Sequence, residues 1–335
     1  MAAMYRSTVR LAALPTLVSV VVALGGCGGG DGDAADAGPA ASRTSSAPTS
    51  SSPAYALARV ETGHKPCGIL GVDGTVWVSN YGDNTLVTVD PETGAVGEPV
   101  RTGSAPCGLA AGAGSIWVED YGGDQVTRVS TTDGSVQATY DVGDQPYDVT
   151  FAAGAAWVTN YGDGTVSRID ATTGRVTEVH TGGTPIGIAP AGGRVWVGLG
   201  DQGIAAIDTR TGTVSDTIAT DGSAGWTAYD DDHVWVNVGS TVVQVDPASA
   251  TITRTVPVGD RPLDGTVADG RVWVGDGGAD GALYWFPVDG EETQAMSVPS
   301  TVQKPFVAAE LDGRLWVVDF IGTDVVQLDP ARIIG

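Results

Sequence analysis

Short stretches of alternating apolar and polar residues, separated by turn residues, recur along the chain from residue 55 onward. Alternation with a period of two is typical of strands that bury one face, and no stretch shows the period of about 3.6 residues of an amphipathic helix. Within one segment the pattern predicts four short strands, over residues 148–152, 155–159, 165–170 and 176–181. The chain is therefore expected to be all-β, with frequent turns and little helix.

A tryptophan followed by valine marks an internal repeat of about forty residues. The tryptophans of this register are Trp77, Trp117, Trp157, Trp196, Trp235, Trp273 and Trp316. Eleven residues before each one stands a proline, except in the fifth repeat, which has Ala224. Four short antiparallel strands every forty residues are typical of one blade of a β-propeller. We interpret the register tryptophans as core residues that pack against the neighbouring blade.

Seven repeats fill residues 55–335, but the seventh ends too early to supply a fourth strand of its own. The segment 55–63 matches the segment 98–103, which precedes the proline of the second repeat. We therefore expect the N-terminal strand to complete blade seven, because this pairs two sheet edges that would otherwise be open. The predicted fold is an all-β, seven-bladed propeller of four-stranded antiparallel blades, closed by that strand.

The residues before the repeats predict a secretion signal and a tether. Arg6 and Arg10 precede an uncharged apolar run that is too short to span a membrane, so residues 1–26 are interpreted as a signal peptide. Residues 27–54 contain no aromatic residue and no aliphatic residue larger than alanine, which predicts a disordered Gly/Ala/Ser/Pro tether. The folded domain would then face an oxidising, extracytoplasmic compartment.

Composition and charge narrow the range of partners. The 335 residues carry 17 Lys and Arg against 40 Asp and Glu, a net charge of −23. Loss of Arg6 and Arg10 with the signal peptide would make the charge of the mature chain −25. Nucleic-acid binding depends on neutralising phosphates, so this balance excludes a nucleic acid and favours a neutral or cationic partner. We expect a monomer.

Two motifs carry a resemblance to known families. The frame of residues 146–174, PYDVTFAAGAAWVTNYGDGTVSRIDATTG, resembles the YVTN-type (YncE-like) propellers and the related streptogramin-lyase-like propellers, with a departure from their Pro-x-Gly start at Asp148. This resemblance covers residues 55–330 and implies the propeller fold, whereas it says little about function. Residues 24–27, LGGC, resemble the lipobox of bacterial lipoproteins. That resemblance implies a diacylglycerol on Cys27 and anchoring to the cell membrane.

The residues that follow the register proline are expected to begin the innermost strands, next to a central channel. They combine thiols, carboxyls and aromatic rings, which is typical of a small-molecule site, although inner-strand packing is the alternative interpretation. The candidates are Cys67, Cys107, Tyr147, Asp148, Trp226, Asp264 and Phe306. Cys67 and Cys107 occupy one register in adjacent repeats, so a disulfide between them and a pair of free thiols are both open.

The turns between the second and third strands form a second candidate surface. Three consecutive repeats carry a tyrosine there, Tyr81, Tyr121 and Tyr161. The acidic residues around these tyrosines are Asp83, Glu119, Asp120 and Asp163. Asn, Asp and Gly are typical of such turns for conformational reasons, but turn chemistry does not require tyrosine. We interpret the set as an acidic aromatic patch suited to a cationic or carbohydrate partner.

Signals of catalysis are sparse. His64, His180 and His233 share no register that would bring two of them together, and no histidine matches the metal-associated cluster on the channel face of streptogramin lyases. We predict a ligand- or protein-binding scaffold of the cell envelope, with no cofactor and no metal site. One alternative is a streptogramin-lyase-like lyase or hydrolase on a small cyclic or sugar-like substrate, using Asp148, Asp264, His64 and a divalent cation. Another is a purely structural envelope protein.

Overall fold

The computed structural model describes residues 53–334 with short gaps. The gaps are residues 231, 279–280, 293–294, 300–301 and 303. The expected signal peptide, the lipidation site at Cys27 and the tether up to residue 52 lie outside the described residues. No helix in the part of the chain that the structure describes is long and apolar enough to cross a lipid bilayer.

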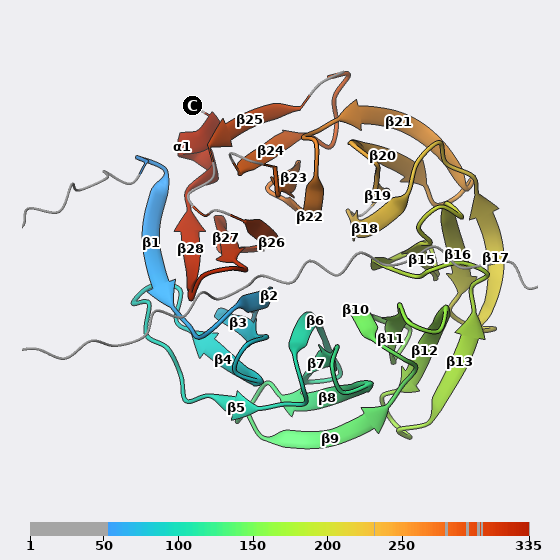
Figure 1. Ribbon diagram of the computed structural model, residues 1–335, viewed down its shortest axis with the longest axis horizontal. Coiled ribbons are helices and arrows are strands. Elements are labelled where there is room, and N and C mark those ends of the chain that lie inside the picture. The colour runs from blue at the N-terminus through green and yellow to red at the C-terminus, as the bar shows by residue number, and fades with distance from the viewer. Residues whose placement is uncertain are drawn as a thin grey trace, which may run out of the picture. The chain divides into compact units, whose positions relative to one another are not determined.

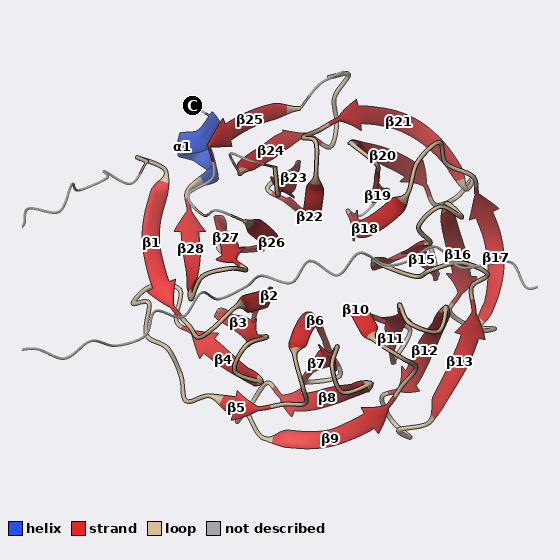
Figure 2. Cartoon of the chain, viewed as in Figure 1, coloured by secondary structure: helices blue, strands red, loops and turns tan. Residues whose placement is uncertain are grey.

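Seven four-stranded antiparallel sheets surround a common axis and form a β-propeller (Figure 1). Almost all regular structure in the described residues is strand, with one short helix near the C-terminus (Figure 2). In each blade successive strands lie progressively farther from the axis, so that the first strand of a repeat is innermost. The predicted all-β fold with seven four-stranded blades is confirmed, and the strands of blade 3 begin and end within two residues of the predicted ranges.

Strand bounds in the first half of the ring follow the repeat. Blade 1 contains β2 (Pro66–Val72), β3 (Thr75–Asn80), β4 (Thr85–Val89) and β5 (Val100–Arg101). Blade 2 contains β6 (Pro106–Gly112), β7 (Ser115–Asp120), β8 (Gln125–Ser130) and β9 (Val136–Asp141). Blade 3 contains β10 (Pro146–Ala152), β11 (Ala155–Asn160), β12 (Thr165–Asp170) and β13 (Val176–His180). Blade 4 contains β14 (Ile188–Ala191), β15 (Arg194–Gly198), β16 (Ile204–Asp208) and β17 (Thr213–Ile218).

The second half of the ring is built in the same way, except at the seam. Blade 5 contains β18 (Ala224–Tyr229), β19 (Val234–Val238), β20 (Thr241–Asp246) and β21 (Thr251–Pro257). Blade 6 contains β22 (Pro262–Ala268), β23 (Arg271–Asp276), β24 (Ala282–Pro287) and β25 (Met296–Pro299). Blade 7 contains β26 (Pro305–Leu311), β27 (Arg314–Asp319), β28 (Asp324–Leu328) and, from the other end of the domain, β1 (Ala56–Glu61). The helix α1 (Pro330–Ile334) follows β28.

The ring closes through antiparallel pairing of β1 with β28, where blue meets red in Figure 1. Val60 pairs with Val325, and its side chain is buried in the cluster between blade 7 and blade 1. Beside it, Arg59 donates a hydrogen bond of 2.8 Å to the carboxylate of Asp324. The predicted completion of blade seven by the N-terminal strand is therefore confirmed.

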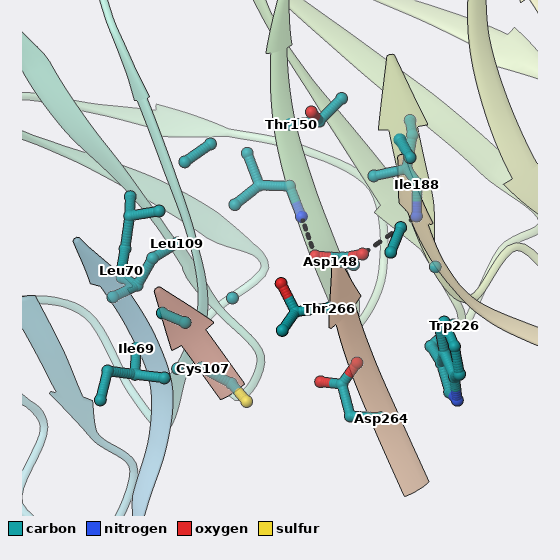
Figure 3. A pocket seen from close by; sticks show the side chains of 18 of the residues that line it. Ile69, Leu70, Cys107, Leu109, Asp148, Thr150, Ile188, Trp226, Asp264 and Thr266 are labelled. Atoms are coloured by element: carbon teal, nitrogen blue, oxygen red, sulfur yellow. Dashed lines mark hydrogen bonds between the residues drawn. The ribbon is translucent and has the colours of Figure 1, made fainter. Parts of the chain in front are cut away.

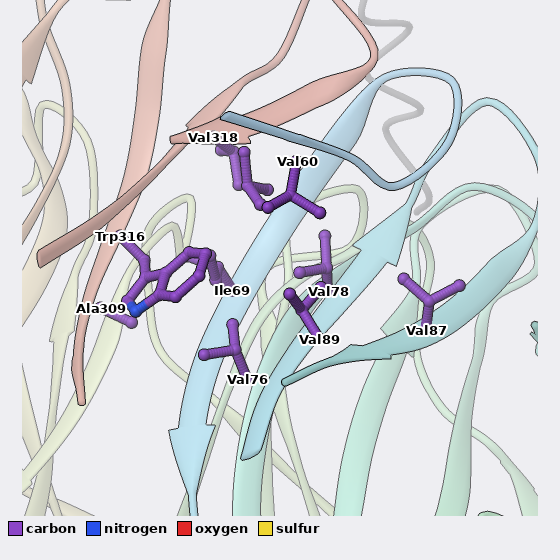
Figure 4. Packing of buried hydrophobic residues seen from close by; sticks show 10 residues of the cluster. Val60, Ile69, Val76, Val78, Val87, Val89, Ala309, Trp316 and Val318 are labelled. Atoms are coloured by element: carbon purple, nitrogen blue, oxygen red, sulfur yellow. The ribbon is translucent and has the colours of Figure 1, made fainter. Parts of the chain in front are cut away.

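The hydrophobic core lies between the blades. Trp316 of blade 7 belongs to one buried cluster with Val76, Val78 and Val89 of blade 1 (Figure 4). Trp117 of blade 2 packs in the same way against blade 3. Several indoles also form a hydrogen bond through their N–H group within their own blade. In Trp117, for example, Nε1 donates to the carbonyl of the residue five positions earlier at 3.1 Å. The predicted interblade position of the register tryptophans is confirmed, with at most 4% of any of them exposed.

Deleting residues 55–62 is expected to lower the melting temperature by about 10 °C, because it removes the ladder of β1 and opens an edge on β28. The matched control is a chain that begins at Pro53, which keeps every described strand. Differential scanning calorimetry of the two chains measures the effect. Equal melting temperatures would contradict the contribution of this seam to stability.

Candidate functional site

The inner strands of the seven blades enclose a cavity of about 900 Å³ along the axis of the ring. Its lining includes residues from β2, β6, β10, β18, β22 and β26, together with the segment that leads into β14. Tyr81, Tyr121 and Phe320 line the end at which the inner strands begin. Tyr229 and Glu310, close to the ends of their strands, line the opposite end.

Glycine at the second position after the register proline allows adjacent inner strands to approach closely. A Cβ at Gly68 would collide with the carbonyl oxygen of Cys107 in the next blade, and one at Gly187 would collide with the backbone of Trp226. The hydroxyl of Ser79, two residues after the register tryptophan, accepts the N–H of Gly68 at 2.8 Å and donates to the carbonyl of Cys107 at 2.6 Å. Hydrogen bonding thus links neighbouring blades where they are closest.

Thr159 forms the same link in blade 3. Its hydroxyl accepts the N–H of Asp148 at 3.0 Å and donates to the carbonyl of Ile186 in blade 4 at 2.6 Å. In this part of the ring, the residue two places after the register tryptophan therefore lies where one blade meets the inner strand of the next. Blade 2 has Glu119 at that position.

Blades 3 and 6 carry an aspartate at the position where blades 1, 2 and 4 have the close-packed glycine. Oδ2 of Asp148 accepts the N–H of Ile188 in blade 4 at 2.9 Å, and Oδ1 accepts the N–H of Val149 at 2.8 Å. Oδ1 of Asp264 accepts the N–H of Gly265 at 2.7 Å. Figure 3 shows Asp148 and Asp264 reaching into the same part of the cavity from β10 and β22. The structure therefore brings together the two aspartates that the sequence singled out.

Glu119 adds a third carboxyl to the cavity wall. It is fully buried, and its Oε1 accepts the N–H of Gly108 at 2.7 Å. Its other oxygen, Oε2, has no hydrogen-bond partner. Gly108 makes room for this arrangement, because a Cβ there would lie 3.1 Å from Glu119 Cγ and 3.3 Å from Asp148 Oδ1. The expectation that Glu119 belongs to a surface patch is wrong, since its side chain points from β7 into the interior.

Burial raises the pKa of all three carboxyls, and the charge of Asp148 adds to the effect at Asp264 and Glu119. Burial raises the pKa of Asp148 to about 7, against the hydrogen bonds from Ile188 and Val149 that lower it. Burial and the charge of Asp148 raise the pKa of Asp264 well above its usual value. Burial raises the pKa of Glu119 strongly as well, and Asp148 adds to the effect. The three groups titrate as a coupled set, so they do not all ionise together near neutral pH.

Aromatic rings border the mouth of the cavity at the end where the inner strands begin. Phe306 stacks on Phe320 with ring centroids 4.9 Å apart, and Tyr81 lies edge-on to Phe320 at 5.9 Å. On the other side Tyr147 contacts Tyr121 at 6.3 Å and Tyr161 at 5.8 Å. We call Tyr81, Tyr121, Tyr147, Tyr161, Phe306 and Phe320 the aromatic rim. Burial, followed by the charges of Asp264, Asp148 and Glu119, raises the pKa of Tyr147 to about 12.

Phe320 is not among the site residues predicted from the sequence, although its position in the repeat could have identified it. In blade 7 it occupies the position in the repeat that Tyr81, Tyr121 and Tyr161 occupy in blades 1 to 3. It is therefore the fourth aromatic residue in this turn. The same register explains why it reaches the rim. Glu119 could have been found similarly, since it is the one carboxyl at the position of Ser79 and Thr159.

The other acidic residues expected around the tyrosines have structural roles. Asp120 is buried, and its carboxylate accepts hydrogen bonds from Gly103 N–H at 2.9 Å and from the hydroxyl of Thr127 at 2.6 Å. Asp83 accepts the N–H of His64 at 2.7 Å, and Asp163 accepts the N–H of Asp144 at 3.0 Å. The predicted acidic surface patch is therefore reduced to two turn aspartates that hold neighbouring loops.

His64 does not join the channel aspartates. Its side chain is 76% exposed, with Nδ1 lying 3.8 Å from Asp83 Oδ1 in the turn outside the cavity. The proposed combination of His64 with Asp148 and Asp264 is thus not assembled by the fold. Trp226 does line the cavity, and its Nε1 is buried without a hydrogen-bond partner.

Cys67 and Cys107 form a disulfide that joins β2 to β6 beside the cavity, with their Cα atoms 4.9 Å apart. No group of three or more His, Cys, Asp or Glu side chains within the described ranges is placed to hold a metal ion. In addition, both oxygens of Asp148 already accept backbone N–H groups. Within the described residues the two aspartates therefore lack the further protein ligands that a divalent cation needs.

Replacing Asp148 with Asn is expected to change how stability depends on pH. The unfolded chain ionises Asp148 near pH 4 and the folded chain near pH 7, so between these values the unfolded state binds fewer protons and the free energy of unfolding falls as pH rises. Asp148→Asn removes this contribution. The stability of the variant relative to the parent should therefore rise by about 1–3 kcal/mol between about pH 4.5 and pH 8.

Urea denaturation across that range measures the difference, and the exposed Asp201→Asn is the matched control. Asp201→Asn should follow the parent in parallel at every pH. A parallel curve for Asp148→Asn as well would contradict the raised pKa of Asp148.

The same architecture occurs in solved structures of low sequence identity. One is Kuenenia stuttgartiensis hydrazine synthase, with a TM-score of 0.69, 16% identity, and coverage of 81% of this chain and 97% of that chain. Another is the WD40 β-propeller domain of Doa1, with a TM-score of 0.68, 11% identity, and coverage of 82% and 96%. No protein-family model matches the sequence, and no curated protein matches it with statistical significance. At these identities the likeness shows the propeller fold alone.

Proposed function

We propose that this protein is a lipid-anchored, extracytoplasmic binding module that takes a small ligand into the cavity at the axis of its propeller. The observation that carries the proposal is the cavity itself, which combines about 900 Å³ with an aromatic and aliphatic lining and a few converging polar groups. Sites for small molecules have this size and this composition. The hydrophobic core lies between the blades, so the lining is free to serve recognition.

The ligand would enter from the end that carries the aromatic rim. Asp148 and Asp264 lie near the starts of β10 and β22, which places the converging carboxyls close to that end. Tyrosine and phenylalanine offer large contact areas with little loss of side-chain entropy, so they suit the mouth of a binding site. A partner protein that covers the rim would use the same groups.

The sequence and the disulfide support an extracytoplasmic location, and the repeat motif supports a relationship to known propellers. The apolar run that ends in LGGC supports export and a lipid on Cys27. The Cys67–Cys107 disulfide agrees with an oxidising compartment. The frame of residues 146–174 supports a relationship to the YVTN-type propellers.

The facing aspartates favour a second candidate, a lyase or hydrolase that acts on a small cyclic or sugar-like substrate. A carboxyl with a pKa of about 7, as at Asp148, can donate or accept a proton at neutral pH. Asp264 would hold the opposite protonation state, since coupled carboxyls share protons unequally. Turnover of a bound ligand that Asp148→Asn abolishes without loss of binding would establish this function.

Filling the cavity is expected to abolish binding. Thr266→Phe places a ring beside Asp148 and Asp264 (Figure 3), whereas Thr217→Phe adds the same ring to the exposed outer strand β17. The parent chain from Pro53 on should retain a small molecule from an extract of its host's envelope, detected by native mass spectrometry, and melt at a higher temperature with it. Thr217→Phe should retain the same molecule, and Thr266→Phe should lose it.

Retention by Thr266→Phe at the level of the parent would contradict a ligand in the channel. Loss of retention by both variants would point to a damaged fold, so circular dichroism melting of the ligand-free variants accompanies the measurement. The binding proposal requires Thr266→Phe to lose the ligand while its own fold persists.

Replacing Cys27 with Ala is expected to release the protein from the membrane. Lipid attachment needs the thiol, and the rest of the leader supplies no second anchor once it is cleaved. Fractionation and labelling with radioactive palmitate of cells that express the full chain measure the outcome. The parent should be labelled and sediment with membranes, and C27A should be unlabelled and soluble. A labelled C27A would contradict lipidation at this cysteine.

A further inference from the structure

We propose that the ligand of this cavity is an organic cation with a primary ammonium group, which the carboxyls of Glu119, Asp148 and Asp264 bind after it passes the aromatic rim. This inference rests on the proposed function and names the chemical class of its ligand. It depends on four features of the cavity: its charge, an unpartnered acceptor, its aromatic mouth and the protons that its carboxyls hold.

Three of the acidic groups that line the cavity have no basic partner among the described residues. Among the described residues that line it, none is a lysine, an arginine or a histidine. The carboxyls near the rim are Glu119, Asp148 and Asp264, and Asp230 and Glu310 lie towards the other end. Buried carboxylates in proteins are ordinarily paired with a cation. To Glu119, Asp148 and Asp264 the protein supplies only backbone N–H groups, so a positive charge brought by a ligand would stabilise their ionised forms.

Glu119 provides an observation that points specifically to an N–H donor. Its Oε1 accepts the N–H of Gly108, whereas Oε2 is buried and has no hydrogen-bond partner. A buried carboxylate oxygen without a donor is destabilising, because it loses its hydration and gains no hydrogen bond in return. A primary ammonium group carries three N–H donors and a charge, so it can satisfy this oxygen and still has donors for further acceptors.

The aromatic rim offers a route for the same kind of ligand. Tyr81, Tyr121 and Tyr147 line the cavity together with Phe306 and Phe320. The faces of aromatic rings attract ammonium groups, and a hydrophobic part of the ligand would stack on the same rings. The net charge of −23 over the whole chain adds a long-range attraction for cations in solution.

The coupling to protons gives this inference a signature that a neutral ligand lacks. Because Asp148 has a pKa of about 7 and the pKa values of Asp264 and Glu119 are also raised, a bound cation would displace protons from the set near neutral pH. Tyr147 stays protonated throughout, with a pKa of about 12. Affinity for the cation should therefore increase with pH, by up to about tenfold per pH unit for each proton released.

Three probes of similar shape separate charge from size: phenethylamine, phenethyl alcohol and phenylpropionate. Isothermal titration calorimetry of the chain from Pro53 on would measure their binding from about pH 6 to about pH 8.5, where phenethylamine stays protonated. We expect phenethylamine to bind at least about tenfold more tightly than the alcohol at pH 8, and phenylpropionate to bind least. Repeating the titration in buffers with different ionisation enthalpies should show proton release with the amine alone.

Variants locate the effect in the carboxyl set. Asp264→Asn and Glu119→Gln should each weaken phenethylamine about tenfold and flatten its pH dependence, while the alcohol is unaffected. The matched control is Glu178→Gln, which removes the same charge from the exposed outer strand β13 and should change neither. Since Glu119 is buried and its replacement can affect folding, the Asp264 variant and the pH series of the parent decide independently.

Equal binding of the amine and the alcohol at every pH would overturn the cation inference, and so would an absence of binding by all three probes. Neither result would contradict a ligand site in the channel. That site is tested separately, by whether the parent retains the envelope ligand and Thr266→Phe loses it. Tighter binding of phenylpropionate would overturn the inference as well, because the carboxyls would then act as protonated donors towards an anion.

Discussion

Every blade of this propeller is apolar on both of its faces, and this constraint determines the rest of the structure. The valines and tryptophans of the middle strands are buried only if a neighbouring blade covers each face, as Trp316 is covered by Val76 and Val78. An open row of blades would leave two such faces in water. Closure is therefore part of the core, and β1 joins β28 because blade 7 and blade 1 must also be held together.

Closing the ring forces seven inner strands towards one axis. Where they are closest the chain uses glycine, as at Gly68 and Gly187, or a hydroxyl that bonds to both blades, as at Ser79. The three carboxyls that reach the cavity near the rim are departures from the repeat: Asp148 and Asp264 replace the glycine, and Glu119 replaces the hydroxyl. The repeat builds the frame, and the exceptions to it supply the chemistry.

The sequence predicted the frame almost completely, since the spacing of tryptophan and proline reports a period and a period determines which strands are neighbours. It also predicted that Tyr147, Asp148 and Asp264 lie beside the channel, because their register places them at the start of inner strands. It placed the turn tyrosines on a second surface, whereas the structure brings Tyr81 and Tyr121 to the mouth of the cavity. It failed for Glu119 and His64 for physical reasons. The alternation along β7 predicts on which face of the sheet Glu119 lies. Whether its carboxyl is then exposed to solvent or buried against the glycine of its own blade depends on the packing around Gly108, which the alternation does not report. The direction of His64 depends on a loop held by Asp83.

Three carboxyls without a basic partner, of which Glu119 is fully buried and Asp148 and Asp264 are partly buried, reduce the stability of any fold, and a large core is needed to tolerate them. Here that core lies between the blades, where it does not depend on what lines the channel, so the free energy lost at the axis is offset elsewhere. The arrangement follows a general rule for binding sites, in which groups that are poorly satisfied in the free protein become satisfied in the complex. Backbone N–H groups fix the carboxyl orientation beforehand, as Ile188 does for Asp148. Binding of a complementary ligand then requires little reorganisation of the protein, because the ring itself fixes the strands that hold these groups. Little of the binding free energy is therefore lost to ordering the site.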